Sequence, residues 1–580
     1  MLILSILFQL SSSAVTIRRD KSILYARSVI TVLVVCLVVN INNYFSDFQD
    51  KGLGLFHGLF TSSATTHVFS MFIFIISALI LQLNAFYGRK VWTDVFNSVY
   101  KLLLNKLVYY NSFILNKMAE QYRIIEYSII ISFVIIGGIF LMSSSNLISI
   151  FICIELQSYG LYILCSVYRN SEKAVSAGLT YFLLGGLSSC FILLASGLLY
   201  ANSGNMNFDG LFIVNNVASV SDKPDDSLLT LQISLYQSYY INFALTIMSV
   251  GFLFKVTAAP FHFWSPDVYD AIPTIVTTFV AIFAKISIFI LLLQLVNYAG
   301  YLLVNKPEDS TIINFSWTFT FLISSLLSMV IGSILGLTQF RIKRLYAYST
   351  INHVGFILLA LTINSIESIQ SFIFYLLQYS LANLNAFILL ITIGITLYIY
   401  IEKKDSKENT LNILSDKKNS PMQLISQMKG YFYINPAIAI SLAITLFSFA
   451  GIPPLVGFFA KQMVLSSALE KGYVFISIVA ILTSVISAYY YLALIKNIFF
   501  LKSDYILNPQ VINTTIKGNL INRLSNNSVD TVIVNDKNIL LNGSLSITIA
   551  VLTLIILLFI LNPQEWLSLA NVLALIIFNC

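Results

Sequence analysis

The chain contains few charged residues. Only 10% of its 580 residues are Asp, Glu, Lys or Arg, whereas 57% are hydrophobic and the mean hydropathy is +0.83. A soluble domain carries about 25% charged residues, so this composition excludes a soluble globular protein and predicts a polytopic membrane protein. The net charge of +7 does not indicate nucleic-acid binding, because the Lys and Arg residues are spread over short loops.

Histidine and cysteine are also scarce. The chain has four histidines, and its five cysteines show no CxxC or other metal-ligand spacing. Neither a G-x-G-x-x-G nor a G-x-x-x-x-G-K-[ST] sequence is present, which excludes the common nucleotide-binding motifs. We therefore expect no haem, iron–sulfur, zinc or nucleotide site, and any redox centre should lie on another chain.

Long hydrophobic runs predict an all-α protein with about fourteen transmembrane helices, two of them discontinuous. The twelfth run contains the break GIPP, and the segment after Pro563 is interpreted as interfacial. The first run is interpreted as a span rather than a signal peptide, because its basic residues follow it. The predicted spans are residues 2–16, 23–43, 66–86, 124–142, 144–168, 173–201, 234–258, 270–298, 315–338, 345–363, 368–400, 433–469, 473–501 and 545–561.

Basic residues favour every second loop. Most of the Lys and Arg residues follow odd-numbered spans, and the positive-inside rule then predicts that both termini lie on the opposite side of the membrane. The loops after even-numbered spans contain only Lys51, Lys223, Lys306 and Lys471.

Two parts of the chain resemble each other at an offset of about 194 residues, which aligns Pro260 with Pro454 and Ser158 with His353. The matched spans start on opposite sides of the membrane. This predicts a duplication into two inverted five-helix repeats, with the discontinuous helices beside a conduction path. The expected units are an N-terminal three-helix segment and loop (1–123), the first inverted repeat (124–298), the second inverted repeat (315–501), and a polar loop with the C-terminal helix (502–580).

The stretch from residue 251 to 293 combines charges with helix breaks. Lys255 ends an apolar helix that breaks at Pro260. A second break follows at Pro273, and Lys285 lies in the middle of the next apolar run. A lysine at mid-depth in a bilayer costs roughly 2.5–3.5 kcal/mol on insertion scales, and non-helical backbone at that depth persists only inside protein or beside a water-filled cavity. This stretch therefore indicates an ion path.

Glu155, in the middle of the fifth span, and Lys461, seven residues beyond Pro454, are also expected at depth. Burial disfavours a charged side chain, whereas an opposite charge nearby favours it. A lysine balanced between these effects can load and release a proton when its carboxylate partner moves. We predict that Glu155 modulates Lys255. Lys285 is then the relay, and Lys461 holds the proton nearest the exit. The alternative is a set of static ion pairs that select one helix arrangement.

His353 is the remaining candidate for the relay. Imidazole changes charge near neutral pH, so His353 could bridge the two halves, although a lone histidine on an apolar helix is more often a hydrogen-bonded core residue. His262 is interpreted as shaping the break beside it. Arg341, Lys343 and Arg344 are predicted to anchor the chain on the positive side of the membrane.

Five sequences carry a resemblance to a known family: IELQSYGLYIL, KVTAAPFHFWSPDVYDAIPT, AKISIF, KRLYAYSTINHVGF and AGIPPLVGFFAKQMVL. With them the chain resembles the antiporter-like membrane subunits of respiratory NADH:ubiquinone oxidoreductase (complex I), over about residues 124–501. The FHFW and PDVY sequences favour the chain 2 type over chains 4 and 5, and the lysine at 461 argues against chain 4. The family's proton-path residues, a glutamate of the fifth span and lysines of the seventh, eighth and twelfth, correspond to Glu155, Lys255, Lys285 and Lys461.

The resemblance implies a subunit of NADH:ubiquinone reductase (H⁺-translocating) without a cofactor of its own, because FMN, the iron–sulfur clusters and ubiquinone bind elsewhere in that complex. It implies a mitochondrial inner-membrane location, with both termini in the intermembrane space and the basic loops in the matrix. The implied partners are other membrane-arm subunits (a chain 4 type and a small chain 4L type), accessory subunits and lipids including cardiolipin, but no nucleic acid. The long polar loops 87–123 and 502–544 fall outside the resemblance.

Two other functions stay open. The chain could be a subunit of a multi-subunit sodium/proton antiporter, which shares the ancestral fold, or a membrane-arm scaffold without transport of its own. Co-purification with flavin and iron–sulfur absorbance distinguishes the first, and proton uptake after replacement of Lys285 distinguishes the second.

Overall fold

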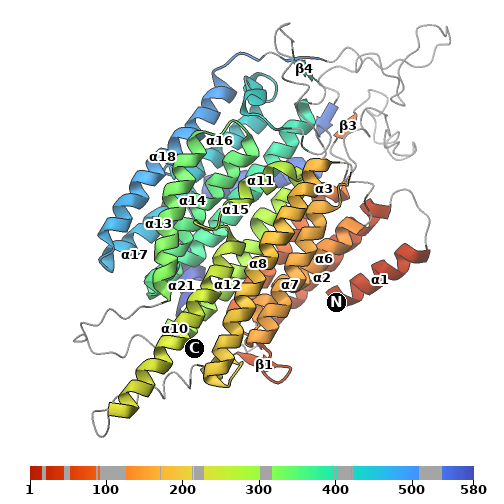
Figure 1. Cartoon of the computed structure of the whole chain (residues 1–580). Helices are drawn as coiled ribbons and strands as arrows, with labels where there is room; N and C mark the ends of the chain where they lie inside the picture. Colours follow the sequence, from red (N-terminus) through yellow and green to blue (C-terminus); the bar gives the residue numbers. More distant parts are fainter. Residues whose placement is uncertain are drawn as a thin grey trace, which may run out of the picture.

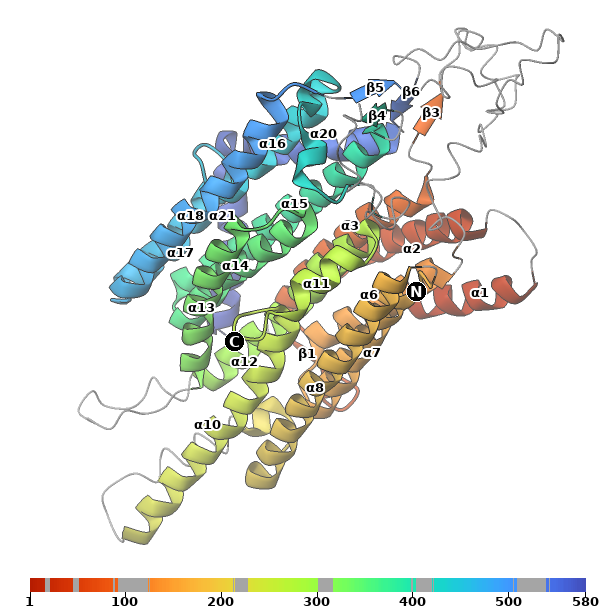
Figure 2. The ribbon, with the colours of Figure 1, turned by 45° about the horizontal axis from the view of Figure 1, so that its top comes forward.

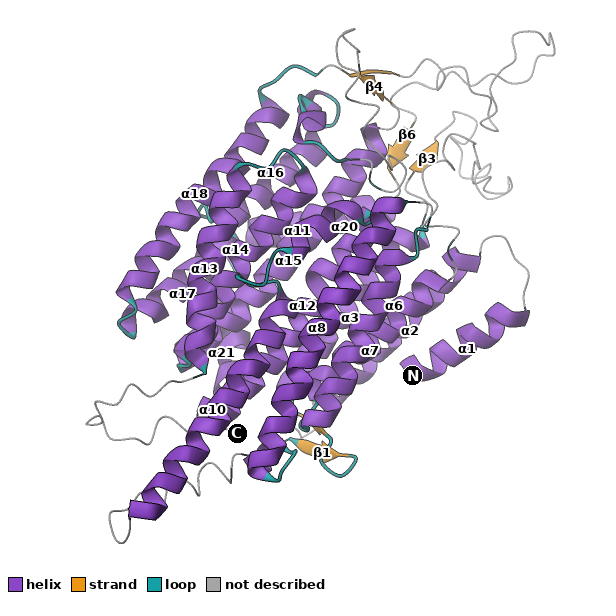
Figure 3. Ribbon diagram, viewed as in Figure 1, coloured by secondary structure: helices purple, strands orange, loops and turns teal. Residues whose placement is uncertain are grey.

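The structure of the chain, a computed structural model, is built almost entirely of helices (Figure 3). Within the described part of the chain, the strands are three residues long and form three two-stranded sheets. The structure describes residues 1–15, 21–44, 52–86, 89–91, 124, 126–169, 171–211, 213, 228–300, 317–397, 400–402, 420, 422–503, 505–507, 539–541 and 543–579.

Every predicted span falls on a helix, which confirms the all-α polytopic fold. Among the described residues, eleven helices are long and apolar enough to cross a membrane. The other three predicted spans correspond to α1, α10 and the α16–α17 pair, whose described apolar stretches are shorter or interrupted. The helices are α1 (Leu2–Val15), α2 (Lys21–Tyr44), α3 (Ala64–Ala85), α6 (Glu126–Ser143), α7 (Leu147–Ser166), α8 (Glu172–Ser203), α10 (Leu228–Val256), α11 (Trp264–Ala271), α12 (Thr274–Gly300), α13 (Thr318–Leu337), α14 (Ile342–Ile363), α15 (Ile366–Leu397), α16 (Pro436–Ala450), α17 (Val456–Glu470), α18 (Val474–Phe499), α20 (Gly543–Leu558) and α21 (Pro563–Asn579), with short 3-10 turns η4 (Ile425–Met428), η5 (Tyr431–Tyr433) and η7 (Phe559–Leu561).

Three helices, α12, α14 and α15, form the centre of the bundle and are almost completely buried. On one side α12 packs against α3, α6 and α10, and on the other side it packs against α15 (Figures 1 and 2). Helix α15 in turn contacts α14, α16, α17, α20 and α21. Side chains projecting between α12, α14 and α15 are therefore surrounded by protein on all sides.

The first predicted break is present. Helix α10 ends at Val256, and the chain folds back so that the indole nitrogen of Trp264 donates to the backbone carbonyl of Phe254, 3.1 Å away. The eighth span, predicted to begin at residue 270, begins instead at Thr274. The reason is that Pro273 disfavours a helical conformation at the residue before it, and Ile272 is extended (φ −77°, ψ 156°).

The predicted break at GIPP separates α16 from α17. Gly451 ends α16 in the left-handed region (φ +82°), and its backbone N–H donates to the carbonyl of Phe447. Such a conformation favours glycine because it has no Cβ. Helix α17 starts only at Val456, so the peptide groups of residues 451–455 lie outside any helix.

The contact of α6 with α7 is matched by the contact of α13 with α14. A Cβ added at Gly137 would lie 2.9 Å from the backbone nitrogen of Gln157, and one added at Gly332 would lie 2.7 Å from that of Asn352. Positions 137 and 332, and likewise 157 and 352, differ by the same 195 residues. Both helix pairs therefore approach closely at a glycine of equivalent position.

The short sheets join segments that are distant in sequence. Strand β1 (Leu53–Leu55) pairs with β2 (Phe60–Ser62) as a hairpin, whereas β3 (Arg89–Val91) pairs with β6 (Ile539–Leu541) and β4 (Tyr400–Glu402) with β5 (Tyr505–Leu507). In Figure 1 the hairpin and the strands β3 and β4 lie at opposite ends of the bundle. Most of loops 87–123 and 502–544 lies outside the described residues.

Candidate functional site

Glu155 and Lys255 form a buried ion pair between α7 and α10. The Lys255 Nζ atom lies 3.6 Å from Glu155 Oε1, and the two side chains are only 8% and 15% exposed. Lys255 Nζ also donates to the Ser158 hydroxyl at 3.3 Å. Ser158 in turn donates to the backbone carbonyl of Ile154. The structure thus brings together the first two residues of the predicted relay.

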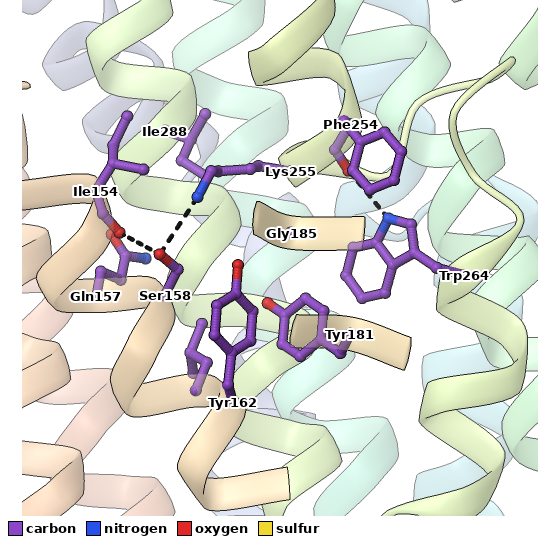
Figure 4. A pocket seen from close by; sticks show the side chains of 11 residues that line it. Ile154, Gln157, Ser158, Tyr162, Tyr181, Gly185, Phe254, Lys255, Trp264 and Ile288 are labelled. Atoms are coloured by element: carbon purple, nitrogen blue, oxygen red, sulfur yellow. Dashed lines mark hydrogen bonds between the residues drawn. The ribbon is translucent and has the colours of Figure 1, made fainter. Parts of the chain in front are cut away.

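A small cavity of about 20 Å³, enough for a water molecule, lies beside Lys255. Figure 4 shows the Lys255 amine pointing at Ser158, with Tyr162 and Tyr181 next to them. The Tyr181 ring stacks on Trp264, with ring centroids 4.5 Å apart, so the break after α10 forms one wall. The cavity is lined by Ile154, Gln157, Ser158, Leu161, Tyr162, Tyr181, Gly185, Phe254, Lys255, Trp264 and Ile288.

Lys285 lies in the centre of the bundle on α12 and is 1% exposed. Its Nζ atom lies 3.4 Å from the hydroxyl oxygen of Tyr379 on α15, and 6.0 Å from the ring centroids of both Tyr269 and Tyr379. Among the described residues, no carboxylate lies within ion-pair distance of this amine. Within the described chain, the Lys285 amine therefore contacts one hydroxyl and lies near the faces of two aromatic rings.

His353 is held between two tyrosines. Its Nδ1 atom lies 2.8 Å from the Tyr375 hydroxyl on α15, and its Nε2 atom lies 3.5 Å from the Tyr491 hydroxyl on α18. Tyr491 also forms a short hydrogen bond with Ser349. His353 is thus a hydrogen-bonded core residue. It also lies near Lys461, because its ring is 5.3 Å from that of Phe449, whose carbonyl accepts from the Lys461 amine.

Lys461 on α17 turns back toward the end of α16. Its Nζ atom donates to the backbone carbonyls of Phe449 and Ala450, each 3.0 Å away, and lies 5.6 Å above the ring of Phe356. Carbonyl groups in the last turn of a helix have no partner within it and carry partial negative charge. The break therefore supplies the acceptors that hold this buried amine.

The five predicted residues fall into two groups. Glu155 and Lys255 form one group, and Lys285, His353 and Lys461 surround α15. The described residues contain no direct hydrogen bond between the groups. Several buried polar atoms near the groups lack a protein partner in the described chain, including the Tyr269 hydroxyl and the Gln157 amide nitrogen, and such atoms normally bind ordered water.

Ionic contacts join α11 to the start of α14, and we did not predict them from the sequence. Arg341 pairs with Asp270 at 2.6 Å, and Arg344 pairs with Asp267 at 2.9 Å. The acidic residues lie between Pro260 and Pro273, so they connect the break after α10 to the helix that carries His353. The sequence carries no local signal for these pairings, because they depend on which helices become neighbours.

Lys343 corrects the prediction of a membrane anchor. The residue is 1% exposed, and its Nζ atom donates to the carbonyl of Ile272 at 2.7 Å and to the Ser420 hydroxyl at 2.6 Å. The reason is that the break at Ile272–Pro273 leaves a free carbonyl inside the protein, which attracts the amine. His262 lies in the break after α10, as interpreted, where its carbonyl accepts from the backbone N–H of Ser265.

Comparisons with known proteins agree with this architecture. The family described as "NADH:quinone oxidoreductase/Mrp antiporter, TM" matches residues 144–487. NADH-ubiquinone oxidoreductase chain 2 of Rhizopus oryzae is 41% identical over 100% of both chains. The protein of the same name from Oenothera berteroana is 34% identical over 66% of this chain and 68% of its own, and NADH-quinone oxidoreductase subunit N of Pelagibacter ubique is 33% identical over 77% and 78%.

Two solved structures share the fold. A chain of respiratory complex I from Thermus thermophilus superposes with a TM-score of 0.65 at 21% identity, covering 98% of this chain and 97% of its own. A chain of the Mrp complex from Dietzia sp. DQ12-45-1b superposes with a TM-score of 0.68 at 16% identity, covering 100% and 97%. The full-length identity and the family match decide the assignment: the chain belongs to the antiporter-like membrane subunits of NADH:quinone oxidoreductase, and among them to the chain 2 type.

Proposed function

We propose that this chain carries protons across the membrane along Glu155, Lys255, Lys285, His353 and Lys461, as a subunit of an NADH:ubiquinone oxidoreductase. One observation supports this most: within the described chain, the amines of Lys285 and Lys461 are buried without a carboxylate partner. A buried unpaired charge is costly. Static ion pairs would not leave two lysines in that condition, whereas sites that gain and lose a proton would.

The arrangement gives each residue a role in proton transfer. Glu155 stabilises the ammonium form of Lys255 while the two are paired, and separation of the pair favours release of the proton. Lys285 receives it at the centre of the bundle. Lys461 holds a proton against the carbonyls at the end of α16, and the electron-transfer part of the complex has to supply the energy for its release.

The matched glycine contacts support a duplication of this site. We infer that residues 124–298 and 315–501 are two inverted copies, preceded by the segment 1–123 and followed by 502–580. In this arrangement the break between α10 and α12 corresponds to the break between α16 and α17. Each copy then supplies one lysine beside a break, Lys255 in the first and Lys461 in the second.

The proposed setting is the mitochondrial inner membrane, where the described helices form a multi-pass protein. Both termini are proposed to face the intermembrane space and the basic loops the matrix, because of the distribution of Lys and Arg. The proposed neighbours are chain 4 type and 4L type subunits, accessory subunits and lipids such as cardiolipin. FMN, the iron–sulfur clusters and ubiquinone are assigned to other parts of the complex.

Purification through a tag on this chain tests the proposed function. We expect a large assembly with flavin and iron–sulfur absorbance, which oxidises NADH with ubiquinone. During this reaction it should change the internal pH of sealed vesicles, in the direction set by its orientation in the vesicle membrane. An assembly without these chromophores that exchanges sodium for protons would instead establish the sodium/proton antiporter. The measurement is the mass and absorbance spectrum of the purified complex.

The cavity beside Lys255 gives a further prediction. Gly185→Ala should displace Tyr162, because a Cβ at 185 would lie 1.8 Å from the Tyr162 hydroxyl oxygen. Since Tyr162 lies beside Ser158 and Lys255, proton uptake by vesicles should fall about threefold to tenfold, which corresponds to a barrier higher by about 1 kcal/mol. The matched control is Gly186→Ala, where a Cβ meets no atom within 4 Å. Equal uptake by the two variants would show that pumping does not need this cavity.

A further inference from the structure

Helix α15 carries two buried tyrosines four residues apart, Tyr375 and Tyr379. Side chains at positions i and i+4 of a helix lie on the same face. That face is directed at the space between α12 and α14, because Tyr379 contacts Lys285 of α12 and Tyr375 contacts His353 of α14. One face of one helix therefore touches two members of the proposed relay that lie on different helices.

The hydroxyl of Tyr379 is placed to accept from Lys285. It lies 3.4 Å from the Nζ atom, and it is the one hydrogen-bond partner of that amine among the described residues. The ring of Tyr379 also lies 5.8 Å from the ring of His353. Tyr379 thus adjoins Lys285 through its hydroxyl and His353 through its ring.

The hydroxyl of Tyr375 is placed to reach the imidazole. It lies 2.8 Å from Nδ1 of His353, within the normal range for a hydrogen bond. The ring of Tyr375 lies 6.0 Å from that of His353. A tyrosine hydroxyl both donates and accepts, so each of these groups can pass a proton on without carrying a charge itself.

We propose that Tyr379 and Tyr375 conduct the proton between Lys285 and His353. An N–H bond of the Lys285 ammonium breaks and its proton binds to the Tyr379 oxygen, while the original Tyr379 hydroxyl proton passes to a water molecule between the tyrosines. That water gives a proton to Tyr375, whose own hydroxyl proton moves to Nδ1 of His353. Lys285 ends neutral, His353 ends protonated, and both tyrosines are neutral before and after.

This inference rests on the proposed function and extends it from the charged residues to the hydroxyls between them. A purely structural role for the pair would be to fill space with two rings and to hold Lys285 and His353 in position, and its loss would lower complex content. The two roles differ in one atom of each side chain, because phenylalanine keeps the ring and removes the hydroxyl. The substitutions Tyr379→Phe and Tyr375→Phe therefore separate conduction from packing.

The experiment measures proton uptake and NADH:ubiquinone turnover of the purified complex in sealed vesicles, with complex content as the check on assembly. We expect Tyr379→Phe and Tyr375→Phe each to lower proton uptake about tenfold, the change produced by a 1.36 kcal/mol higher barrier, at normal complex content. The matched control is Tyr346→Phe, because Tyr346 is buried on α14 and its hydroxyl has no partner in the described chain. Its proton uptake should equal that of the unaltered complex.

Lys285→Met in the same preparation makes the outcomes distinct. Reduced uptake in Lys285→Met and in both tyrosine variants supports the inference. Reduced uptake in Lys285→Met with normal uptake in Tyr379→Phe and Tyr375→Phe overturns the tyrosine bridge and leaves the proposed function intact. Normal uptake in all three variants overturns the proposed function itself.

Discussion

Replacing Lys285 by methionine should lower proton uptake about tenfold or more. Without this amine the proton has no group to bind at the centre of the bundle, and an uncompensated charge at a buried site costs several kcal/mol. Methionine has an unbranched stem of similar length and fills the space, so a cavity does not add to the effect. NADH:ubiquinone turnover should fall in parallel if electron transfer and pumping are tightly coupled. The measurement is proton uptake per NADH oxidised in proteoliposomes that contain the whole complex.

The control for this variant is Lys471→Met. Lys471 is an exposed lysine in the short turn between α17 and α18, so its loss removes the same charge from the chain without touching the centre of the bundle. We expect unchanged pumping in this control. Unchanged pumping and turnover in Lys285→Met as well would show that the buried amine is not on the proton path and would favour a scaffold role.

The positions of the spans and breaks were predictable because their signals are local in sequence. A hydrophobic run of sufficient length has to be a helix in lipid, and proline disfavours a helix at a defined place. The same reason made the four charged candidates identifiable, because a charged residue within a hydrophobic run is evident from the sequence whichever residue it pairs with. These candidates are Glu155, Lys255, Lys285 and Lys461. The structure buries Lys285 and Lys461, and it leaves the side chains of Lys255 and Glu155 only 8% and 15% exposed.

The partners of those charges were less predictable, because they depend on which helices become neighbours. The sequence led us to expect that Glu155 acts on Lys255, and the two residues do form a pair. It did not predict that a tyrosine lies next to Lys285. Tyr375 and Tyr379 are visible in the sequence as an i, i+4 pair, but the same spacing occurs on any packed face. Lys343 was misinterpreted because a basic residue near the end of a span usually reaches the interface, and the carbonyl of Ile272 that binds it is exposed only by the break.

The second large effect is expected for the Glu155–Lys255 pair. Glu155→Gln leaves the Lys255 ammonium, 8% exposed, without its carboxylate, and removing one partner of a buried ion pair costs about 3–5 kcal/mol. We therefore expect a lower content of assembled complex as well as loss of pumping. The measurements are complex content in the membrane, thermal stability of the purified complex, and proton uptake.

The double variant Glu155→Gln with Lys255→Gln distinguishes a static ion pair from a relay. Two neutral amides can hydrogen-bond to each other and to Ser158, so the double variant should recover much of the stability lost in Glu155→Gln, as expected for coupled residues. A static pair serves only to hold α7 against α10, and in that case pumping would recover together with assembly. A relay needs groups that gain and lose a proton, which amides do not do, so we expect recovered assembly without recovered proton uptake. Recovery of both would reduce Glu155 and Lys255 to structural residues.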